Sequence, residues 1–191
     1  MAKHNGNRLR IIGGQWRSRQ LPFPDVEGLR PTTDRVRETL FNWLQPYLPG
    51  ANVLDVFAGS GALGLEALSR EAGQVTLIEK NQKATKQLQD NIRTLNAQNS
   101  SIHMGDALQI LPTLAKAFDV IFLDPPFGKG LLPNCINTIE QHNLISPNGW
   151  IYIESEQALT ELDIPKHWRL HREKKAGQVM LRLFQIMKDT A

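Results

Sequence analysis

From residue 52 onward, short apolar runs alternate with segments whose apolar residues recur at helical spacing. The apolar runs predict strands, and they span residues 52–56, 74–79, 100–104, 118–123 and 149–154. The intervening segments predict helices, and they span residues 61–70, 81–96, 106–115, roughly 130–142 and a short piece near 156–161. Short strands that alternate with helices are typical of a parallel, doubly wound sheet. We therefore expect an α/β fold.

The flanks of this region carry their own structural features. Pro31-Thr32-Thr33-Asp34 predicts the start of a helix, because a threonine cap with a proline and an acid nearby is typical of a helix N-terminus. Residues 167–174 and 178–187 are strand-like and flank Ala176-Gly177, which predicts a closing antiparallel hairpin. With this hairpin the sheet has seven strands and is mostly parallel.

The N-terminal segment predicts a second hairpin. Residues 8–12 and 15–21 flank Gly13-Gly14, and these glycines permit the positive φ angles of a two-residue turn. We therefore divide the chain into an N-terminal β-hairpin extension at residues 1–30 and one domain at residues 31–191.

Composition excludes several classes of protein. No apolar run approaches the roughly 18 residues of a membrane helix, and the polar N-terminus has no signal-peptide core. The single Cys135 cannot form an internal disulfide, and neither it nor the histidines have the spacing of metal ligands. We expect a cytoplasmic protein that needs no metal.

Positive charge is concentrated at the N-terminal end. The whole chain carries a formal net charge of +3, whereas residues 1–37 hold eight Lys and Arg against three acids. Four of these arginines recur with period two along the predicted hairpin and so lie on one face of each strand, and they are Arg8, Arg10, Arg17 and Arg19. Together with Trp16 they suit contacts to phosphates and stacked bases. A solvated basic terminus is the alternative explanation.

A glycine-rich loop follows the first strand of the α/β region. Gly59-Ser60-Gly61 and Gly64 formally match a nucleotide-binding GxGxxG motif, and Glu79 lies twenty residues beyond Gly59 at the end of the next strand. Glycines let the backbone approach a ligand, and a carboxylate at that position can accept hydrogen bonds from both ribose hydroxyls. This pattern indicates a nucleoside cofactor.

Two further acids argue against a nicotinamide cofactor. Asp55 stands at the strand end ahead of the glycines, where it suits the ammonium of a methionyl group better than a pyrophosphate. Asp106, in Gly105-Asp106-Ala107, follows the third strand and can accept a hydrogen bond from an adenine amino group. Asp106 is also a plausible N-cap for the next helix, and the two roles are compatible.

The strand at 118–123 ends at Asp124-Pro125-Pro126-Phe127. Two prolines cannot continue a sheet ladder, so they hold the backbone rigid where the carboxylate and the ring emerge. A carboxylate and a flat ring on a stiff elbow suit a planar polar group such as a nucleobase. The alternative interpretation is that these residues only end the strand and begin an ordinary loop.

The ordered set of these motifs resembles Rossmann-like class I S-adenosylmethionine-dependent methyltransferases, and 124–127 resembles the box of enzymes that methylate amino nitrogens. More closely, the Arg8–Gly14 segment, Arg30–Glu38 and the box at 124–127 are similar to the bacterial RsmD family, over nearly the whole chain. The resemblance implies methyl transfer from S-adenosylmethionine to guanine N2 at position 966 of 16S rRNA, within an assembling small-subunit particle, by a monomer.

The resemblance also implies residue roles. Asp55, Gly59, Ser60 and Gly61 would frame the methionyl end of the cofactor, Glu79 the ribose, and Asp106 with Ala107 the adenine. Asp124 and the Pro125 carbonyl would hold the target amino group, with Pro126 in the same box and Phe127 stacked on the base. Thr32 would close the cofactor pocket, and Arg30 and Arg35 would join the RNA contacts, although their division between cofactor and RNA stays open.

Other functions remain as alternatives. The same box can serve adenine, cytosine or a protein glutamine amide, and the basic N-terminus favours nucleic acid over protein. A nicotinamide oxidoreductase and a non-catalytic RNA-binding protein are the alternatives from other classes.

Overall fold

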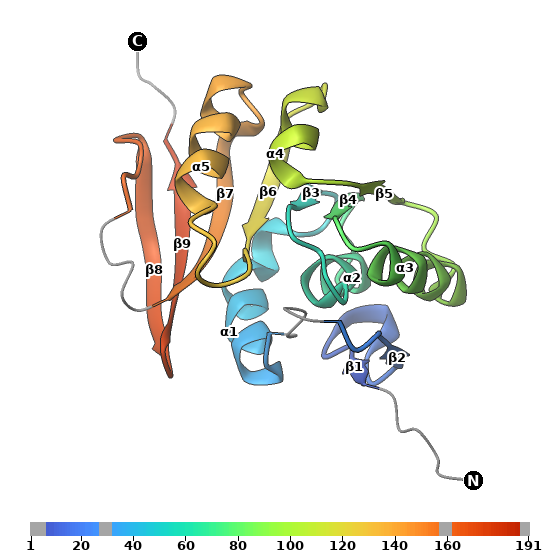
Figure 1. Cartoon of the computed structure of the whole chain (residues 1–191). Coiled ribbons are helices and arrows are strands. Elements are labelled where there is room, and N and C mark those ends of the chain that lie inside the picture. Colours follow the sequence, from blue (N-terminus) through green and yellow to red (C-terminus); the bar gives the residue numbers. More distant parts are fainter. Residues whose placement is uncertain (1–6, 27–31, 157–161, 188–191) are drawn as a thin grey trace, which may run out of the picture.

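The computed structural model describes residues 7–26, 32–156 and 162–187 (Figure 1). Within these residues, seven strands form one sheet in the order β5-β4-β3-β6-β7-β9-β8. The strands are β3 (Asn52–Asp55), β4 (Gln74–Glu79), β5 (Ser100–Met104), β6 (Phe118–Leu123), β7 (Ile145–Glu156), β8 (Trp168–Ala176) and β9 (Val179–Ile186). β3 to β7 pair in parallel, and β9 runs antiparallel to both β7 and β8. The predicted α/β fold and its closing hairpin are confirmed.

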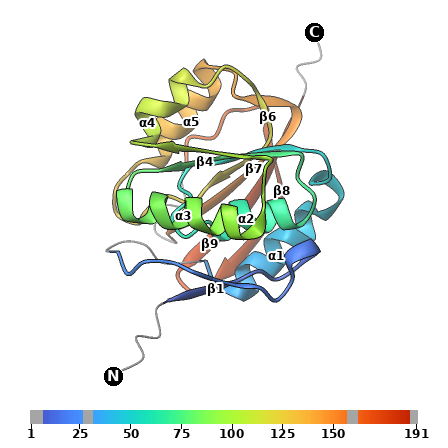
Figure 2. The same ribbon diagram turned by 90° about the vertical axis from the view of Figure 1, so that its right-hand side faces the viewer.

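Helices cover both faces of the sheet (Figures 1 and 2). They are α1 (Asp34–Leu44), α2 (Ala62–Ser69), α3 (Gln82–Leu95), α4 (Ala107–Ile110) and α5 (Leu132–Gln141). Buried residues of α1, α2 and α3 pack in one apolar cluster with Val53, Phe122 and Tyr152. Those of α4 and α5 pack in a second cluster with Leu54 and Ile121. Successive strand residues point to opposite faces, so each strand supplies both clusters.

Local sequence explains where the helices begin and end. The Thr33 side chain caps α1 by accepting a hydrogen bond from the Val36 N–H, as the sequence predicted. The helix predicted at 106–115 is shorter than expected, because α4 gives way to a 3-10 turn at Leu111–Thr113. Pro112 lies in that turn and lacks the N–H that an α-helix needs. The short helix predicted near 156–161 lies almost wholly outside the described residues, and β7 continues to Glu156.

The N-terminal hairpin exists, but the predicted two-residue turn at Gly13-Gly14 is wrong. β1 (Arg8–Arg10) pairs antiparallel with β2 (Gln20–Pro22), and residues 11–19 connect them through a 3-10 turn at Gly14–Trp16. The connection lies against the end of α2 instead of closing tightly on itself. A Cβ on Gly14, which has φ +75°, would lie 1.8 Å from the Ser69 carbonyl oxygen. Tertiary packing therefore overrides the local turn preference.

This packing also changes the predicted pattern of arginines. Arg8 and Arg10 lie on the exposed face of β1 with Leu9 buried between them, as predicted. Arg17 and Arg19 lie outside β2, exposed in the connecting segment. The apolar residues of the hairpin belong to the core cluster on the α1 side of the sheet, and they are Leu9, Ile11, Leu21 and Phe23. The domain boundary placed at residue 30 falls in the segment 27–31, outside the described residues, and stays a prediction.

None of the helices in the described residues is long and apolar enough to cross a membrane.

Candidate active site

Acidic residues lie at the carboxyl ends of four neighbouring strands. In the spatial order β4, β3, β6 and β7 they are Glu79, Asp55, Asp124 and Glu154. Neighbouring strands lie about 4.8 Å apart, so these side chains form a row along one edge of the sheet. This edge is where open α/β sheets bind their ligands.

Burial makes three of these acids costly to keep ionised, and they are Asp55, Asp124 and Glu154. Asp55 is 2% exposed, and burial raises its pKa to about 7 against the opposing hydrogen bond from the Gly64 N–H, with the charges of Asp124 and Glu79 adding to the rise. Burial raises the pKa of Asp124 to about 6, against an opposing hydrogen bond from Thr32. A cation bound beside these carboxylates would favour their ionised forms. The site is therefore built to receive positive charge.

The glycine loop between β3 and α2 is organised by two of these acids. Asp55 Oδ2 accepts a hydrogen bond of 2.9 Å from the Gly64 N–H, and a Cβ on Gly64 would lie 2.4 Å from Leu77 Cδ2. Glu79 Oε2 accepts from the Gly59 N–H at 2.7 Å, and its Oε1 accepts from the Asn81 N–H at 2.6 Å. Each Glu79 oxygen keeps a further lone pair for a ligand hydroxyl. The backbone N–H groups thus orient the Glu79 carboxylate and leave it able to accept hydrogen bonds from a ligand.

Asp106 caps the helix after β5, as one of the two interpretations expected. Its Oδ1 accepts a hydrogen bond from the Leu108 N–H at 3.0 Å, and its Oδ2 lies 3.0 Å from Lys80 Nζ. The hydrogen bond from Lys80 is the main cause of its lowered pKa, with burial opposing and the Leu108 N–H helping. Ala107 beside it is buried. The adenine role of this pair stays a prediction.

The proline elbow after β6 carries a hydrogen-bonded carboxylate and an exposed aromatic ring. Asp124 Oδ2 accepts a hydrogen bond of 3.0 Å from Thr32 Oγ1, which precedes the cap of α1. Pro125 is buried and Pro126 is exposed, while the Phe127 ring is 49% exposed. The structure therefore joins Thr32 to Asp124 at the start of α1 and leaves an aromatic ring beside them open to a ligand.

Sequence reasoning missed two residues of this site, Glu154 and Tyr152. The pairing of Leu123 with Ile153 places Asp124 and Glu154 side by side at the next register position. Glu154 is 7% exposed, and its Oε2 accepts a hydrogen bond of 3.0 Å from the Tyr152 hydroxyl. Burial and, to a lesser degree, the charge of Asp124 raise the pKa of Glu154 to about 8, against the opposing hydrogen bond from Tyr152. The available clue was an acid directly after the apolar run 150–153, the pattern that singled out Asp124.

Glu154→Gln is expected to flatten the pH dependence of stability in the unliganded protein. The unfolded wild-type chain releases the Glu154 proton near the ordinary pKa of 4.5, whereas the folded protein holds it until about 8. The unfolded state thus binds fewer protons in this window, and wild-type stability falls as pH rises through it, by on the order of a few kcal/mol. The glutamine variant lacks that loss, since it stays neutral and can still accept from Tyr152. Urea unfolding at pH 5 and pH 8.5 measures the difference, and parallel profiles for the two proteins would contradict it.

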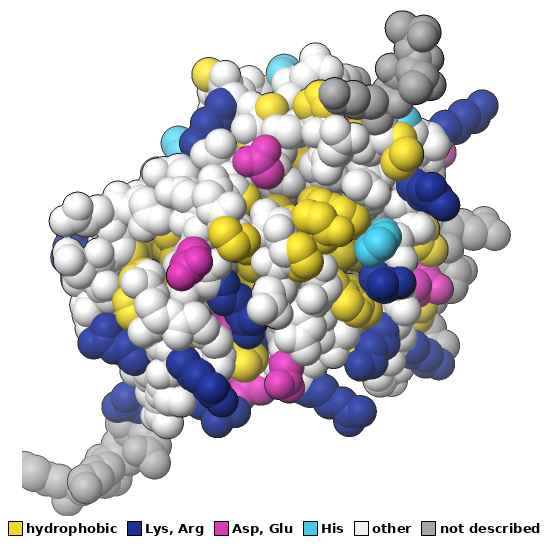
Figure 3. All heavy atoms as spheres, turned by 180° about the vertical axis from the view of Figure 1, so that it is seen from behind, with side chains coloured by type: hydrophobic (Ala, Val, Ile, Leu, Met, Phe, Trp, Pro, Cys, Tyr) yellow, Lys and Arg dark blue, Asp and Glu magenta, His cyan; other side chains and the backbone are white. Residues whose placement is uncertain are grey.

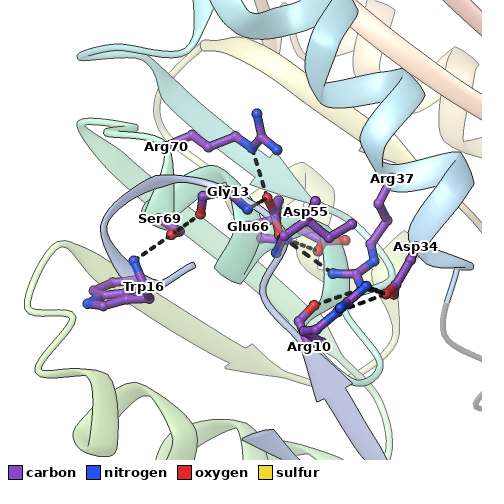
Figure 4. A network of polar contacts seen from close by, with 11 residues as sticks. Arg10, Gly13, Trp16, Asp34, Arg37, Asp55, Glu66, Ser69 and Arg70 are labelled. Carbon is purple, nitrogen blue, oxygen red and sulfur yellow. Dashed lines mark hydrogen bonds and ion pairs between the residues drawn. The ribbon is translucent and has the colours of Figure 1, made fainter. Parts of the chain in front are cut away.

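The predicted RNA-binding residues within the described chain lie on the N-terminal hairpin and the first turn of α1. Arg8, Arg17, Arg19 and Arg35 are exposed, and Arg30 lies outside the described residues. Arg10 is exposed too, but its Nη2 lies 2.7 Å from Asp34 Oδ2. Trp16 is partly buried against the core, and its backbone N–H donates to Ser69 Oγ (Figure 4). Their contacts with RNA stay predictions.

Beneath the hairpin lies a buried polar network centred on Glu66 (Figure 4). Glu66 is fully buried and accepts hydrogen bonds of 2.8 Å from the N–H groups of Ile12 and Gly13 and from Arg70 Nε. Arg37, 1% exposed, places Nη1 at 3.6 Å from Glu66 Oε2 and donates from Nη2 to Asp34 and to the Arg10 carbonyl. The network ties the hairpin to α1 and α2.

Comparisons with known proteins agree with this geometry. The family model described as Conserved hypothetical protein 95 matches residues 9–185. The chain is 51% identical to Ribosomal RNA small subunit methyltransferase D of Escherichia coli (strain K12), with 95% of this chain and 92% of that protein covered. The protein of the same name from Haemophilus influenzae is 45% identical, with 93% of each chain covered.

A solved structure described as a putative methyltransferase from Escherichia coli superimposes with a TM-score of 0.88 at 48% identity, covering 95% of this chain and 99% of that one. A putative methylase from Haemophilus influenzae superimposes with a TM-score of 0.83 at 40% identity, covering 95% of this chain and 100% of that one. The family model and these relatives span nearly the whole chain, including both the hairpin and the row of acids. The chain therefore belongs to the RsmD family of methyltransferases.

Proposed function

We propose that this protein transfers a methyl group from S-adenosylmethionine to the exocyclic N2 of a guanine in 16S rRNA. The observation that carries the proposal is the Asp124-Pro125-Pro126-Phe127 elbow, which stands in a row of acids at the carboxyl edge of the sheet, where open α/β sheets bind their ligands. The relatives named as small-subunit rRNA methyltransferases support rRNA as the substrate class.

The residues present fit the proposed cofactor. When bound, S-adenosylmethionine supplies an activated methyl group on a positively charged sulfonium, next to a charged ammonium. Asp55 and Asp124, whose pKa values burial raises, would regain their charge beside those cations. Glu79 would accept hydrogen bonds from the ribose hydroxyls, and Asp106 with Ala107 would contact the adenine. A nicotinamide cofactor brings a pyrophosphate, which the buried acids would repel.

Asp124 would act on the nucleophile. An exocyclic amine reacts poorly because its lone pair is delocalised into the ring. The Asp124 carboxylate and the Pro125 carbonyl would accept its two N–H groups and direct the lone pair at the methyl group. Each charge-assisted hydrogen bond contributes roughly 1.5–3 kcal/mol. When the amine gains a methyl group, its nitrogen must lose a proton, and Asp124 would accept that proton.

Phe127 and the start of α1 would hold the base in place. The exposed Phe127 ring can stack on the flipped guanine, and base–aromatic stacking is worth roughly 1–3 kcal/mol. Thr32 fixes Asp124 through its hydroxyl and so links α1 to the acceptor site. Positioning and electrostatics, more than any covalent step on the protein, would supply the rate.

The target position within rRNA is the finer part of the proposal. Guanine N2 at position 966, reached within an assembling small-subunit particle by a monomeric enzyme, follows from the family resemblance. The test is transfer of a tritiated methyl group to small-subunit particles that lack the modification, with naked 16S rRNA in parallel, followed by nucleoside analysis. We expect N2-methylguanosine. Label in N6-methyladenosine or in a ribosomal protein would overturn the acceptor, and no transfer at all would overturn the function.

A further inference from the structure

We propose that one face of β8 forms a second RNA-binding surface, on the opposite side of α1 from the N-terminal hairpin. The proposal rests on the proposed rRNA methyltransferase function, and it adds a surface that binds the RNA substrate. This β8 surface consists of Arg169, His171, Arg172 and Lys174 together with Tyr47. All five side chains are exposed.

The strand register places the three cations on one face. Arg172 pairs with Leu183 and Lys174 with Leu181, and both leucines belong to the apolar cluster on the α1 side of the sheet. Arg169 pairs with Gln185, which in turn lies opposite Trp150 of the same cluster. Directly paired residues project to the same side of a sheet. The cations therefore form a row on the α1 side, and Lys174 Nζ reaches Thr39 Oγ1 of α1 at 3.2 Å.

Flat rings lie beside this row. The register shifts between Leu170 and Arg172, and the extra residue, His171, places its ring 4.9 Å from that of Trp150. On the same indole, the Tyr47 ring lies at 4.3 Å and is 40% exposed. Burial and the neighbouring charges of Arg172 and Arg169 lower the pKa of His171, which favours the uncharged ring. Cations next to aromatic rings are the combination that binds single-stranded RNA without reading its sequence.

The charges of the row have no acidic partner in the described part of the chain. The neighbouring Glu173 is engaged by Arg182, with its Oε2 at 2.6 Å from Arg182 Nε. Among the described residues, no carboxylate lies within ion-pair distance of Arg169, Arg172 or Lys174. Figure 3 shows Lys and Arg side chains gathered around a hydrophobic patch and a histidine on the rear face of the molecule. A polyanion would match this surface.

The need to protect a free sheet edge from aggregation explains the charges on β8 but not the aromatic rings beside them. β8 is the last strand of the sheet, and charged residues on such strands prevent edge-to-edge aggregation. That role needs charge but no aromatic rings, and it needs no alignment of the cations on the side of α1. The combination favours a surface that binds RNA.

The Lys174 end of the β8 surface extends toward the site, because Lys174 pairs with Leu181, which in turn pairs with Glu154. β8 runs parallel to β7, and its end reaches Val179, which pairs with Glu156 two residues beyond Glu154. α1 lies between the N-terminal hairpin and β8 (Figure 1). Asp34 of α1 contacts Arg10 of the hairpin, and Thr39 of α1 contacts Lys174 of β8. Thr32, just before α1, contacts Asp124 of the acceptor site. RNA held on both sides of α1 would cross the acceptor site between them.

The test is the salt dependence of binding to unmodified 16S rRNA by fluorescence anisotropy. For Arg172→Ala with Lys174→Ala we expect at least about tenfold weaker binding near 0.1 M salt and a log–log salt slope lower by about 1.5–2, because two phosphate contacts are lost. The matched control is Lys83→Ala with Lys86→Ala, which removes two exposed lysines of α3. The control should bind RNA as the wild type does, and all three proteins should bind S-adenosylhomocysteine equally.

Each other outcome overturns the β8 surface. An unchanged slope with new high-order oligomers would show that the charges only protect the sheet edge. Wild-type binding to naked 16S rRNA with weaker binding to small-subunit particles would assign the surface to a ribosomal protein. If the wild-type protein neither binds nor methylates rRNA, the proposed function itself fails, and that result differs from a defect confined to the β8 variant.

Discussion

Asp124→Asn is expected to slow methyl transfer by roughly 10- to 150-fold, because it weakens a charge-assisted hydrogen bond worth about 1.5–3 kcal/mol. The amide can still accept from Thr32 Oγ1, so α1 should keep its place. It presents only one acceptor oxygen, however, and it cannot take the proton that the amine releases. Asp124→Ala removes the acceptor altogether and should cost more.

Single-turnover methyl transfer measures the chemical step, and calorimetry with S-adenosylhomocysteine measures cofactor binding. S-adenosylhomocysteine, the product of the transfer, lacks the sulfonium charge, so its affinity should change less than about threefold. Asp119→Asn is the matched control, since Asp119 lies on the same strand at its other end and accepts a hydrogen bond of 2.8 Å from the Asn52 N–H. The control should transfer methyl at the wild-type rate. An Asp124→Ala protein that retained that rate would remove Asp124 from the reaction.

Sequence patterns predicted most of what depends on neighbouring residues. β4 and β6 begin and end where the apolar runs predicted, at 74–79 and 118–123. The acids at strand ends could be placed together because carboxyl ends of parallel strands meet at one edge. The sequence alone therefore predicts Asp55, Glu79 and Asp124 at this edge, and the same rule applied to β7 would also have predicted Glu154.

Contacts between distant segments were not predictable in this way. The Gly13-Gly14 pair favours a tight turn, but the amides of Ile12 and Gly13 donate to Glu66, more than fifty residues away. The charge count also treated Arg37 as part of a basic surface, whereas it is 1% exposed and faces Glu66. Composition reports how many charges a segment carries, and only the packed structure tells which of them remain available to a partner.

Glu66→Ala is expected to lower the free energy of unfolding by about 3–5 kcal/mol, because it removes the buried carboxylate that Arg37 and Arg70 share. In the described part of the chain, Arg37 would keep only Asp34 as a counter-ion. Arg37 is incompletely hydrogen-bonded already, since its Nε and Nη1 have no hydrogen-bond partner among the described residues. Nη1 instead forms the ion pair with Glu66 Oε2 at 3.6 Å. The variant would also leave the part-buried N–H groups of Ile12 and Gly13 without their hydrogen-bond acceptor. A loss of this size is a large share of the 5–15 kcal/mol that stabilises a typical domain.

Urea unfolding and thermal melting measure this loss, and the midpoint temperature should fall by roughly 6–20 °C for a chain of this length. Hydrogen exchange at Ile12 and Gly13 should speed up as well, which locates the defect at the hairpin. Asp90→Ala is the control, because Asp90 pairs with Arg93 at 2.8 Å on the surface of α3, where such pairs contribute about 0–1 kcal/mol. Equal stability losses in the two variants would show that the Glu66 network does not anchor the hairpin. A loss confined to Glu66→Ala would mean that the hairpin, with its exposed arginines, rests on a support buried between α1 and α2.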